Sequence, residues 1–415
     1  MTEVGVIPED WRVDKLPNIA WFQEGPGLRN WQFTSSGVKV VNITNMIGDG
    51  TLDLDRTKRH ISSFEAEKSY NHFFIDAKDI LIASSGNSYC KTAVAEAENL
   101  PLMLNTSVIR FKPLSTVSYS YLWVLLNSPD FKNQIDLAIT GGAQPNFGPF
   151  HLRRVKFPLP PTLAEQEAIA GALGDADAFI DSLEQLIAKK RLIKQGTMQD
   201  LLTAKKRLPG FTDDWVETTI KECHSKIWDY RGRTPRKLGM EWGGGPIRAL
   251  SAGNVKMGKI DFEAECYFAS TELYDKWMTH GDTEQGDILV TTEAPLGNVA
   301  LVPDNDRYVL SQRTILLRGN PETTTNEYLA HLFSSEAFQR RLTEDASGST
   351  AQGIQRLKFE KIELCLPSRN EQTAIARILS DMDAELEALE QKLAKARQLK
   401  QGMMQELLTG KTRLI

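Results

Sequence analysis

The sequence has little of what marks secreted, disulfide-linked or membrane proteins. Its 415 residues include four cysteines, at positions 90, 223, 266 and 365, at spacings that fit neither a disulfide framework nor a zinc site. No apolar run approaches the roughly 18 residues of a membrane span, and the first residues do not resemble a signal peptide. We therefore expect a cytoplasmic chain without a membrane partner.

An excess of basic charge is also missing. The chain has 49 Lys and Arg against 54 Asp and Glu, a formal net charge of −5. A protein that binds nucleic acid alone is usually basic. This balance argues against a solitary nucleic-acid binder, but it allows local basic patches or a complex in which a partner supplies phosphate contacts.

Motifs for catalysis are lacking as well. Residues 410–412 (Gly-Lys-Thr) end like a phosphate-binding loop, but the earlier glycine of such a loop is Gln405 here. Cys223 and His224 have no partners at ligand spacing, so we expect a structural role for them. The Asn-Pro-Pro-aromatic run of amino-methyltransferases is absent. We therefore expect no catalytic group, no metal site and no cofactor in this chain.

What the chain does have is a duplicated segment. Residues 159–208 align with 365–414 at a constant shift of 206, and 27 of these 50 positions are identical. The first copy has Thr162 three residues before Glu165, directly after a proline, and the second copy repeats this pattern. Such a pattern is typical of a helix N-terminus with a capping box. The repeat therefore predicts two helices of the same design.

Apolar residues in each copy step by four and three, which is the heptad pattern of a coiled coil. They are Ile169, Leu173, Ala176, Ile180, Leu183 and Ile187 in the first copy, and Ile375, Leu379, Met382, Leu386, Leu389 and Leu393 in the second. If residues 209–367 form a compact domain, they join the end of the first helix to the start of the second. The helices should therefore pair antiparallel, and we expect Gly196 and Gly402 to let them approach closely.

The segments before the two helices repeat more faintly, at shifts between 204 and 209. Asp79-Ile-Leu-Ile matches Asp287-Ile-Leu-Val, and Trp11 matches Trp215, which we expect to serve as core or docking residues. The pattern predicts an α+β fold class: two pseudo-twofold-related α+β domains separated by two long antiparallel coiled-coil helices. The predicted domains are head 1 (residues 1–155), spacer helix 1 (156–208), head 2 (209–360) and spacer helix 2 (361–415).

Polar, Gly-rich segments that differ between the heads lie between the matched strands. They are residues 21–31 against 227–237, 84–91 against 291–298, and 140–147 against 346–353. Loops on a rigid scaffold commonly carry recognition. A shared scaffold with different loops therefore predicts two readers of different objects.

These loops and some segments outside them hold the residue types that read and clamp DNA. An arginine fork matches guanine, a side-chain amide matches adenine, and basic groups contact phosphates. The candidate DNA-binding residues are Arg29, Asn30, Asn87, Lys91, Gln144, Asn146, Arg153 and Arg154 in head 1, and Arg231, Arg233, Arg236, Lys237, Asn298, Gln312, Arg313, Ser349 and Gln352 in head 2. For each of them, an ordinary surface-loop role stays open.

The combination resembles a known family. Two divergent heads, each followed by a helix that opens with a Leu-Pro-Pro-x-x-x-Glu-Gln type of sequence, are similar to the specificity (S) subunit of type I restriction–modification systems, the HsdS family. Residues 157–166 (Phe-Pro-Leu-Pro-Pro-Thr-Leu-Ala-Glu-Gln) fit that pattern closely. The second copy departs from it at Cys365-Leu-Pro367 but keeps Glu371-Gln372. The resemblance covers essentially the whole chain.

The resemblance implies that the heads are target recognition domains, each reading one half of a bipartite, asymmetric sequence in double-stranded DNA. The paired helices would set the gap and dock two methylation (M) subunits, which bind S-adenosylmethionine and methylate adenine N6. Two restriction (R) subunits would add ATP- and Mg-dependent translocation and cleavage. Two other classes stay open at this point: an enzyme with an unrecognised site, and a coiled-coil scaffold protein whose heads bind protein.

Overall fold

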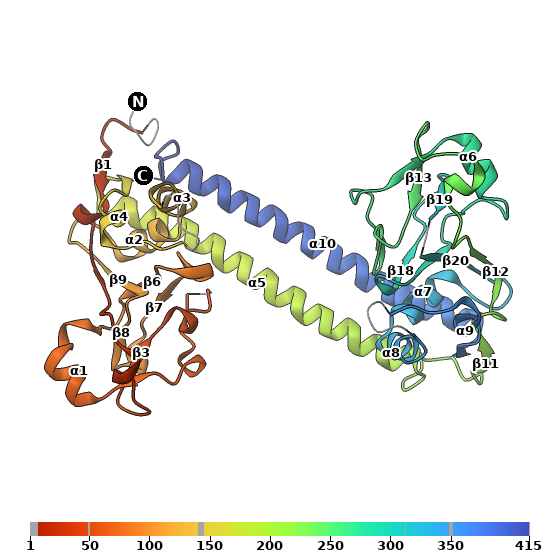
Figure 1. The fold of residues 1–415 in the computed structure, drawn as a ribbon, viewed down its shortest axis with the longest axis horizontal. Helices are drawn as coiled ribbons and strands as arrows, with labels where there is room; N and C mark the ends of the chain where they lie inside the picture. Colours follow the sequence, from red (N-terminus) through yellow and green to blue (C-terminus); the bar gives the residue numbers. More distant parts are fainter. Residues whose placement is uncertain (1–6, 49, 140–144, 312, 348–351, 415) are drawn as a thin grey trace. The chain divides into compact units, whose positions relative to one another are not determined.

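The chain forms two compact units, each of which contains one head. The computed structural model describes residues 7–48, 50–139, 145–311, 313–347 and 352–414. Unit 1 combines Met1–Glu184 with Lys392–Ile415, and unit 2 is Gln185–Gln391. The two long helices, α5 (Leu163–Leu202) and α10 (Arg369–Leu407), each contribute to both units (Figure 1). Among the described residues, every helix is too short or too polar to span a bilayer.

Head 1 contains two four-stranded sheets. The main sheet has the order β2-β9-β6-β7, formed by Ala20–Glu24, Val108–Pro113, Ile80–Ala83 and Thr92–Val94. The second has the order β4-β3-β8-β5, formed by His60–Ile61, Val38–Val41, Leu102–Leu104 and Phe74–Ile75. The remaining elements are β1 (Arg12–Lys15), paired with β10 (Lys156–Leu159), and helices α1 (Ser63–Ser69), α2 (Tyr119–Leu126), α3 (Pro129–Ala138) and α4 (Pro149–Leu152).

Head 2 repeats this arrangement with a second sheet of three strands. Its main sheet has the order β12-β20-β17-β18, formed by His224–Asp229, Thr314–Gly319, Ile288–Thr292 and Leu296–Leu301. The second sheet is β16-β13-β19 (Tyr267–Ala269, Ile247–Leu250, Tyr308–Leu310), in which β13 and β19 are parallel, as β3 and β8 are in head 1. The other elements are β11 (Val216–Thr219) with β21 (Glu363–Leu366), β14 (Val255–Lys256) with β15 (Lys259–Ile260), and α6 (Thr271–Trp277), α7 (Asn326–Ser334), α8 (Glu336–Glu344) and α9 (Arg356–Glu360).

The duplication extends to a buried ion pair in each main sheet. Arg110 on β9 contacts Asp79 at 3.1 Å, and Arg318 on β20 contacts Asp287 at 2.7 Å. Both carboxylates are buried, and the two pairs are related by a shift of 208 along the chain. A buried charge is stable only with a partner. Each pair therefore links the same two neighbouring strands in both copies, β6 with β9 and β17 with β20. The predicted pair of related α+β heads is confirmed.

The core of each unit combines a head with the start of one long helix and the end of the other. In unit 1, Leu173 of α5 and Leu407 of α10 belong to one buried cluster with head 1. In unit 2, Leu202 of α5 and Leu379 of α10 occupy the matching places. Residues 234 positions apart in unit 1 and 177 positions apart in unit 2 are therefore packed into the same core. Unit 1 combines two separate stretches of chain, whereas unit 2 is one continuous stretch.

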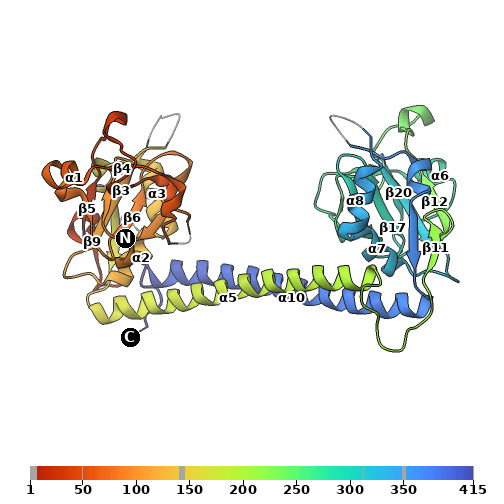
Figure 2. The same cartoon turned by 90° about the horizontal axis from the view of Figure 1, so that it is seen from below.

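Within each unit the segments of α5 and α10 run antiparallel, as predicted (Figure 2). In unit 1, Asp177 pairs with Lys400 and Glu184 pairs with Arg397. In unit 2, Lys194 pairs with Asp383 and Arg191 pairs with Glu390. These pairs lie on partly exposed faces, so they contribute more to the register of the helices than to stability.

The expectation that Gly196 and Gly402 allow a close helix approach is wrong. A Cβ atom placed on either glycine would meet nothing within 4 Å. The apolar seam, rather than these glycines, holds the helices together: Ile180, Leu183 and Ile187 are all less than 9% exposed.

The Glu-Gln pair that opens each long helix has a different use from the one predicted. Thr162 does accept a hydrogen bond from the Glu165 amide at 3.2 Å, as in a helix cap. However, both carboxylate oxygens of Glu165 accept hydrogen bonds from Arg413, beyond the end of α10. Glu371 is bound in the same way by Arg207, at 2.7 Å to each oxygen. Each arginine therefore joins the end of one long helix to the start of the other.

The glutamine of the same motif ties its helix to the head. The Gln166 side-chain oxygen accepts from the Ser118 amide at 2.8 Å, and its amide donates to the Pro160 carbonyl at 3.2 Å. Gln372 makes the matching bonds with Thr325 and Pro367 in unit 2. Both glutamines are buried, so these bonds satisfy polar groups that water cannot reach.

Candidate nucleic-acid interface

Three segments far apart in the sequence meet at one edge of the main sheet of head 1. Strands β2 and β6 both pair antiparallel with β9, so they run in the same direction and end at the same edge. The segment at 145–148 lies beside both strand ends: Gly86 donates to the Pro145 carbonyl and Phe147 donates to the Ser84 carbonyl, each at 3.0 Å, and a Cβ placed on Gly148 would lie 3.5 Å from the Glu24 carboxylate at the end of β2. We call residues 25–28, 84–91 and 145–148 the loop edge of head 1.

Head 2 has the same construction. Strands β12 and β17 both pair antiparallel with β20 and end at one edge. There the Ile354 amide donates to the Thr292 carbonyl at 3.0 Å, and the Thr292 amide donates to the Arg313 carbonyl at 2.9 Å. We call residues 230–233, 293–298, 313 and 353–354 the loop edge of head 2. The segments that differ between the heads thus occupy equivalent places.

The structure places the head 1 candidates at and beside this edge. Asn87, Lys91 and Asn146 are exposed, and Asn146 forms a β-bridge with Ser85. Arg29 and Asn30 are exposed at a short 3-10 turn after β2. Arg153 and Arg154 are exposed after α4, with the Arg154 guanidinium 4.5 Å from the Phe150 ring. Gln144 lies outside the described residues.

Several head 2 candidates are held by their own protein. Arg231 binds the Asp229 carboxylate at 2.6 Å and the Ile354 carbonyl at 3.1 Å. Arg233 donates to the Trp277 carbonyl and to Thr279, and Asn298 donates its amide to the Val255 carbonyl at 2.8 Å. These contacts indicate that the side chains brace the loop edge.

The other head 2 candidates lie on the surface or outside the described residues. Lys237 donates to the Gly232 carbonyl at 2.7 Å, and Arg236 and Gln352 are exposed. Gln312 and Ser349 lie outside the described residues.

Arg313 differs from the other arginines of this edge. It sits in the left-handed backbone region at φ +70°, and Ala294 on the facing loop has φ +44°. Such conformations cost a residue with a side chain of the order of 1–3 kcal/mol, and they cluster at functional sites. The Arg313 side chain is 50% exposed and contacts Glu293, which is 44% exposed, at 3.1 Å. Sequence reasoning missed Glu293; its position directly after the strand that ends at Thr292 was the available signal.

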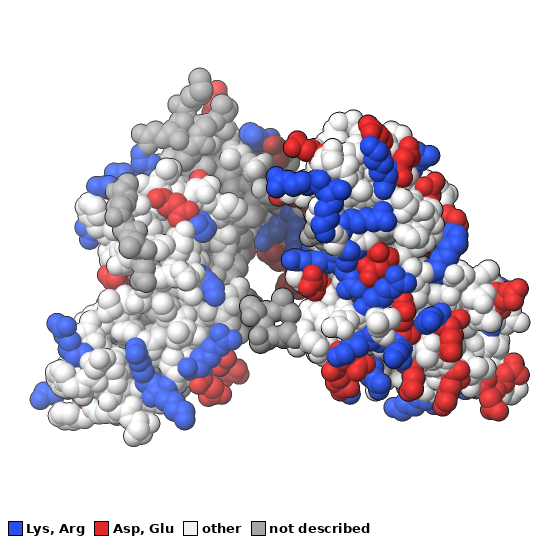
Figure 3. All heavy atoms as spheres, turned by 45° about the vertical axis from the view of Figure 1, so that its right-hand side comes forward, with Lys and Arg blue, Asp and Glu red and all other residues white. Residues whose placement is uncertain are grey.

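The surface of unit 2 carries mixed charge. Lys and Arg side chains of unit 2 spread over the face turned to the reader, with Asp and Glu among them (Figure 3). This agrees with the acidic net charge of the chain.

Cys223 and His224 have the structural role that was predicted. His224 is buried, its Nδ1 lies 2.6 Å from the Ile220 carbonyl, and its ring stacks on Phe333 at 5.9 Å. Burial raises the pKa of Cys223 to about 12, so the thiol stays protonated and unreactive at neutral pH. Among the described residues, no group of three or more His, Cys, Asp or Glu is arranged to hold a metal ion.

His224 makes unit 2 sensitive to acid. Burial lowers the pKa of His224 from its ordinary 6.5 to about 4. Between these values the unfolded chain binds a proton that the folded chain excludes, so stability is complete above pH 6.5 and falls as the pH drops toward 4. The expected loss due to His224 is roughly 3 kcal/mol, measured by urea unfolding from pH 7 to 4, and His331 of the same unit, whose pKa burial lowers in the same way, adds to the total. His224→Gln should therefore reduce this dependence without abolishing it, and the exposed His72→Gln should leave it unchanged; an identical slope in His224→Gln would contradict the assignment.

A serine, a histidine and an aspartate also meet in unit 2 without forming a hydrolase triad. His331 Nε2 lies 3.1 Å from the Ser380 hydroxyl, but its Nδ1 lies 3.9 Å from Asp383, beyond hydrogen-bond reach. Asp383 is paired with Lys194 instead. Burial also lowers the pKa of His331 to about 4, which makes the ring a weak base.

Comparison with known proteins identifies the family. A family model described as the type I restriction modification DNA specificity domain matches residues 8–190 and again residues 213–398. The chain belongs to this family. The type I restriction enzyme MjaVIII specificity subunit of Methanocaldococcus jannaschii is 26% identical over 429 residues, which cover 98% of this chain and 94% of the relative.

Solved structures share the fold. The S subunit of a type I restriction–modification system from M. genitalium aligns over 98% of this chain and 99% of its own, with 15% identity and a TM-score of 0.58. A chain from a structural study of complex assembly and conformational transition of the type I system gives the same identity and TM-score over 98% and 100%. The predicted resemblance and fold class are confirmed.

Proposed function

We propose that this chain selects the DNA sequence for a type I restriction–modification complex. Head 1 reads one half of a bipartite, asymmetric duplex target, and head 2 reads the other half. The observation that carries this proposal is the repeated loop edge: the same three segments meet on the same sheet in both heads, but their side chains differ. Equal scaffolds place the loops alike on two DNA segments, and unlike side chains make the two half-sites different.

We propose further that companion subunits supply the chemistry in the cytoplasm. Two M subunits would bind S-adenosylmethionine and methylate adenine N6, and two R subunits would use ATP and Mg. This chain would then contribute sequence choice and no catalytic group. Family membership supports an assembly of this kind, and the net charge of −5 supports a division of phosphate contacts between the chain and its partners.

Within head 2, we propose that Arg313 and Glu293 read a G·C pair. An arginine fork binds the O6 and N7 of guanine, and a carboxylate accepts from the N4 of cytosine. The two side chains are half-exposed neighbours at the loop edge, whereas Arg231 and Arg233 are held by protein groups. Without DNA, Glu293 holds the Arg313 guanidinium, and base contacts would compete with this pairing.

Selection from random duplexes by the assembled complex tests both proposals. The wild-type complex should enrich two half-sites, and Arg313→Ala should relax G·C preference only in the half-site read by head 2, at a cost of ~1–3 kcal/mol. Lys276→Ala, which removes an exposed pair with Glu272 on α6, is the matched control and should change neither half-site. Loss of preference in the other half-site would refute the role of Arg313, and no enrichment by any complex would refute the function.

A further inference from the structure

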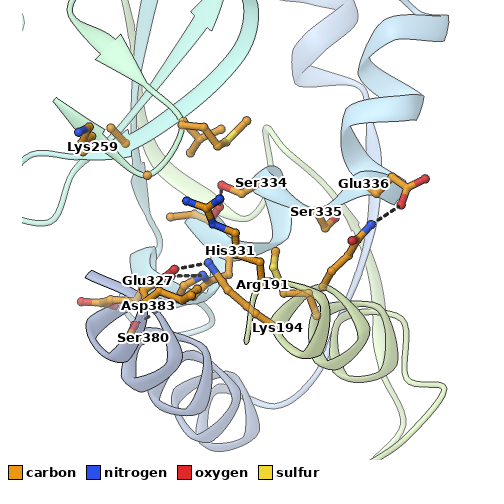
Figure 4. A pocket seen from close by; sticks show the side chains of 18 of the residues that line it. Arg191, Lys194, Lys259, Glu327, His331, Ser334, Ser335, Glu336, Ser380 and Asp383 are labelled. Atoms are coloured by element: carbon orange, nitrogen blue, oxygen red, sulfur yellow. Dashed lines mark hydrogen bonds and ion pairs between the residues drawn. The ribbon is translucent and has the colours of Figure 1, made fainter. Parts of the chain in front are cut away.

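Unit 2 contains a cavity of about 1120 Å³ between the long helices and head 2. Segments of α5 and α10 form one side, and α7, β18 and the turn between β14 and β15 form the other. Figure 4 shows Lys259 on the strand side, and Lys194, His331 and Asp383 together on the helix side. Because the architecture is repeated in the two units, the equivalent place in unit 1 can be compared with this cavity of unit 2.

Helices α2 and α7 match at a shift of 207. Ser128 and Ser335, which follow them, cap the next helix through the same hydrogen bond, to Phe131 and Phe338 respectively. At this shift Trp123 of α2 corresponds to Ala330 of α7, and Asn127 corresponds to Ser334. Both smaller residues line the cavity of unit 2.

In unit 1 the indole ring of Trp123 lies against Gly50. A Cβ placed on Gly50 would be 3.4 Å from two carbons of that ring. Gly258 stands 208 positions after Gly50 and also bonds to the neighbouring strand, but differently: its amide donates to the Val299 carbonyl of β18, whereas the Gly50 carbonyl accepts from the Val94 amide of β7. Gly258 lines the cavity, and a Cβ there would meet nothing within 4 Å. The place that an indole ring fills in unit 1 is therefore open in unit 2.

A second contact, which joins α2 to β7 in unit 1, is also replaced in unit 2. The Asn127 side-chain oxygen accepts from the Thr92 hydroxyl at 2.6 Å, which joins α2 to β7. In unit 2, Ser334 donates to the Ala330 carbonyl of its own helix at 2.7 Å. Residue 299, which corresponds to Thr92, is a valine. At the matched positions, unit 2 therefore has neither the Trp123 indole ring nor the Thr92–Asn127 hydrogen bond.

The charges around the cavity are mostly paired with one another. Arg191 binds Glu390 at 2.6 Å, Lys194 binds Asp383, and His331 lies 3.1 Å from the Ser380 hydroxyl. Because these charges are paired, the cavity offers little net attraction to an ion. The cationic groups of Arg191 and Lys194 nevertheless lie beside the cavity, and a cation favours the face of an aromatic ring. Apolar lining comes from Met198, Val299 and Leu301, among others.

We propose that this cavity receives an aromatic side chain of a companion M subunit, in the place that Trp123 holds in unit 1. The inference rests on the proposed function, because it assumes that companion subunits bind the chain. Unit 1 carries its own ring at this position, so the site belongs to unit 2 alone. The two ends of the chain would then bind their companions with different affinity, although the scaffold is duplicated.

The first test uses indole as the probe and the full-length chain, followed by calorimetry or ligand-observed NMR. The wild type should bind indole at one site. Ala330→Trp should lower the affinity at least tenfold, and Ser334→Asn, which copies unit 1, should lower it less. Trp123→Ala should add a second site. Equal binding by Ala330→Trp and the wild type, or no binding by the wild type, would overturn the proposal; unfolding midpoints show whether each variant is folded.

The second test titrates the chain with purified M subunit. Ala330→Trp should weaken one of the two binding steps at least tenfold, and indole should compete for the same step in the wild type. Unchanged binding of the M subunit by a folded Ala330→Trp would refute the docking role even if indole binds. Random-duplex selection with the wild-type complex separates the proposed DNA specificity from the proposed cavity site. If the complex selects no sequence, the proposed function is refuted, but the result of the indole titration still stands.

Discussion

Replacing Arg110 by alanine is expected to destabilise unit 1 by roughly 3 kcal/mol, because it removes the closer of the two cations at the buried Asp79 carboxylate and leaves only the half-exposed Lys112, at 3.5 Å. The Arg110 and Asp79 side chains are 8% and 1% exposed, and they lie 3.1 Å apart. Arg110 also donates to Gln23 at 2.8 Å and to the His72 carbonyl at 3.1 Å, so the substitution leaves several polar groups without a partner. Urea unfolding followed by circular dichroism measures the loss.

The duplicated chain supplies its own comparison for this experiment. Arg318→Ala removes the equivalent pair with Asp287 and should destabilise unit 2 by a similar amount. Arg397→Ala removes an exposed pair with Glu184, whose side chains are 60% and 44% exposed, and should cost less than about 1 kcal/mol. An Arg110→Ala protein as stable as Arg397→Ala would show that the buried pair is not needed to hold the sheet.

Lengthening both long helices is expected to change the gap of the DNA target and to leave its two half-sites unchanged. Each helix contributes to both units. Along the sequence, the boundary between the units falls between Glu184 and Gln185 in α5 and between Gln391 and Lys392 in α10. Four residues inserted at both points add ~6 Å of helix, which is about two base pairs of duplex. Affinity for the original target should then fall toward non-specific binding, roughly 10³-fold or more.

Random-duplex selection with the lengthened complex measures the new gap directly. The same four residues inserted after Glu98, in an exposed turn of head 1, control for a general effect of insertion and should leave the gap unchanged. Lengthening α5 alone tests whether one helix suffices. Altered half-sites with an unaltered gap would contradict the role of the helices as a ruler.

The local patterns of the chain predicted its helices well. The heptad spacing and the residues after each proline located two helices of 40 and 39 residues, because helix formation depends on neighbours a few positions apart. The same patterns misplaced the use of Glu165. Its carboxylate binds Arg413, 248 positions away, and a local motif carries no information about a partner at that distance.

The recognition residues were harder to rank. Residue type selected Arg231, Arg233 and Arg313 alike, since an arginine fork matches guanine wherever it lies in the chain. Only the folded chain shows that Arg231 is held by Asp229 and the Ile354 carbonyl, whereas Arg313 keeps a half-exposed guanidinium in a strained backbone. Which of them contacts DNA stays a prediction, and Arg313 is now the first to test.

By itself, the sequence determined that one head and one helix occur twice, that the helices pair antiparallel, and that the family is that of type I specificity subunits. Identity at a constant shift and periodic apolar positions are properties of the chain that need no coordinates. The tertiary structure alone decided which loops share a sheet edge, which arginines are braced, and that Ala330 leaves open the space that Trp123 fills. These features depend on packing between residues far apart in the chain, where the volume of a single side chain determines whether the space between two elements is filled or left open.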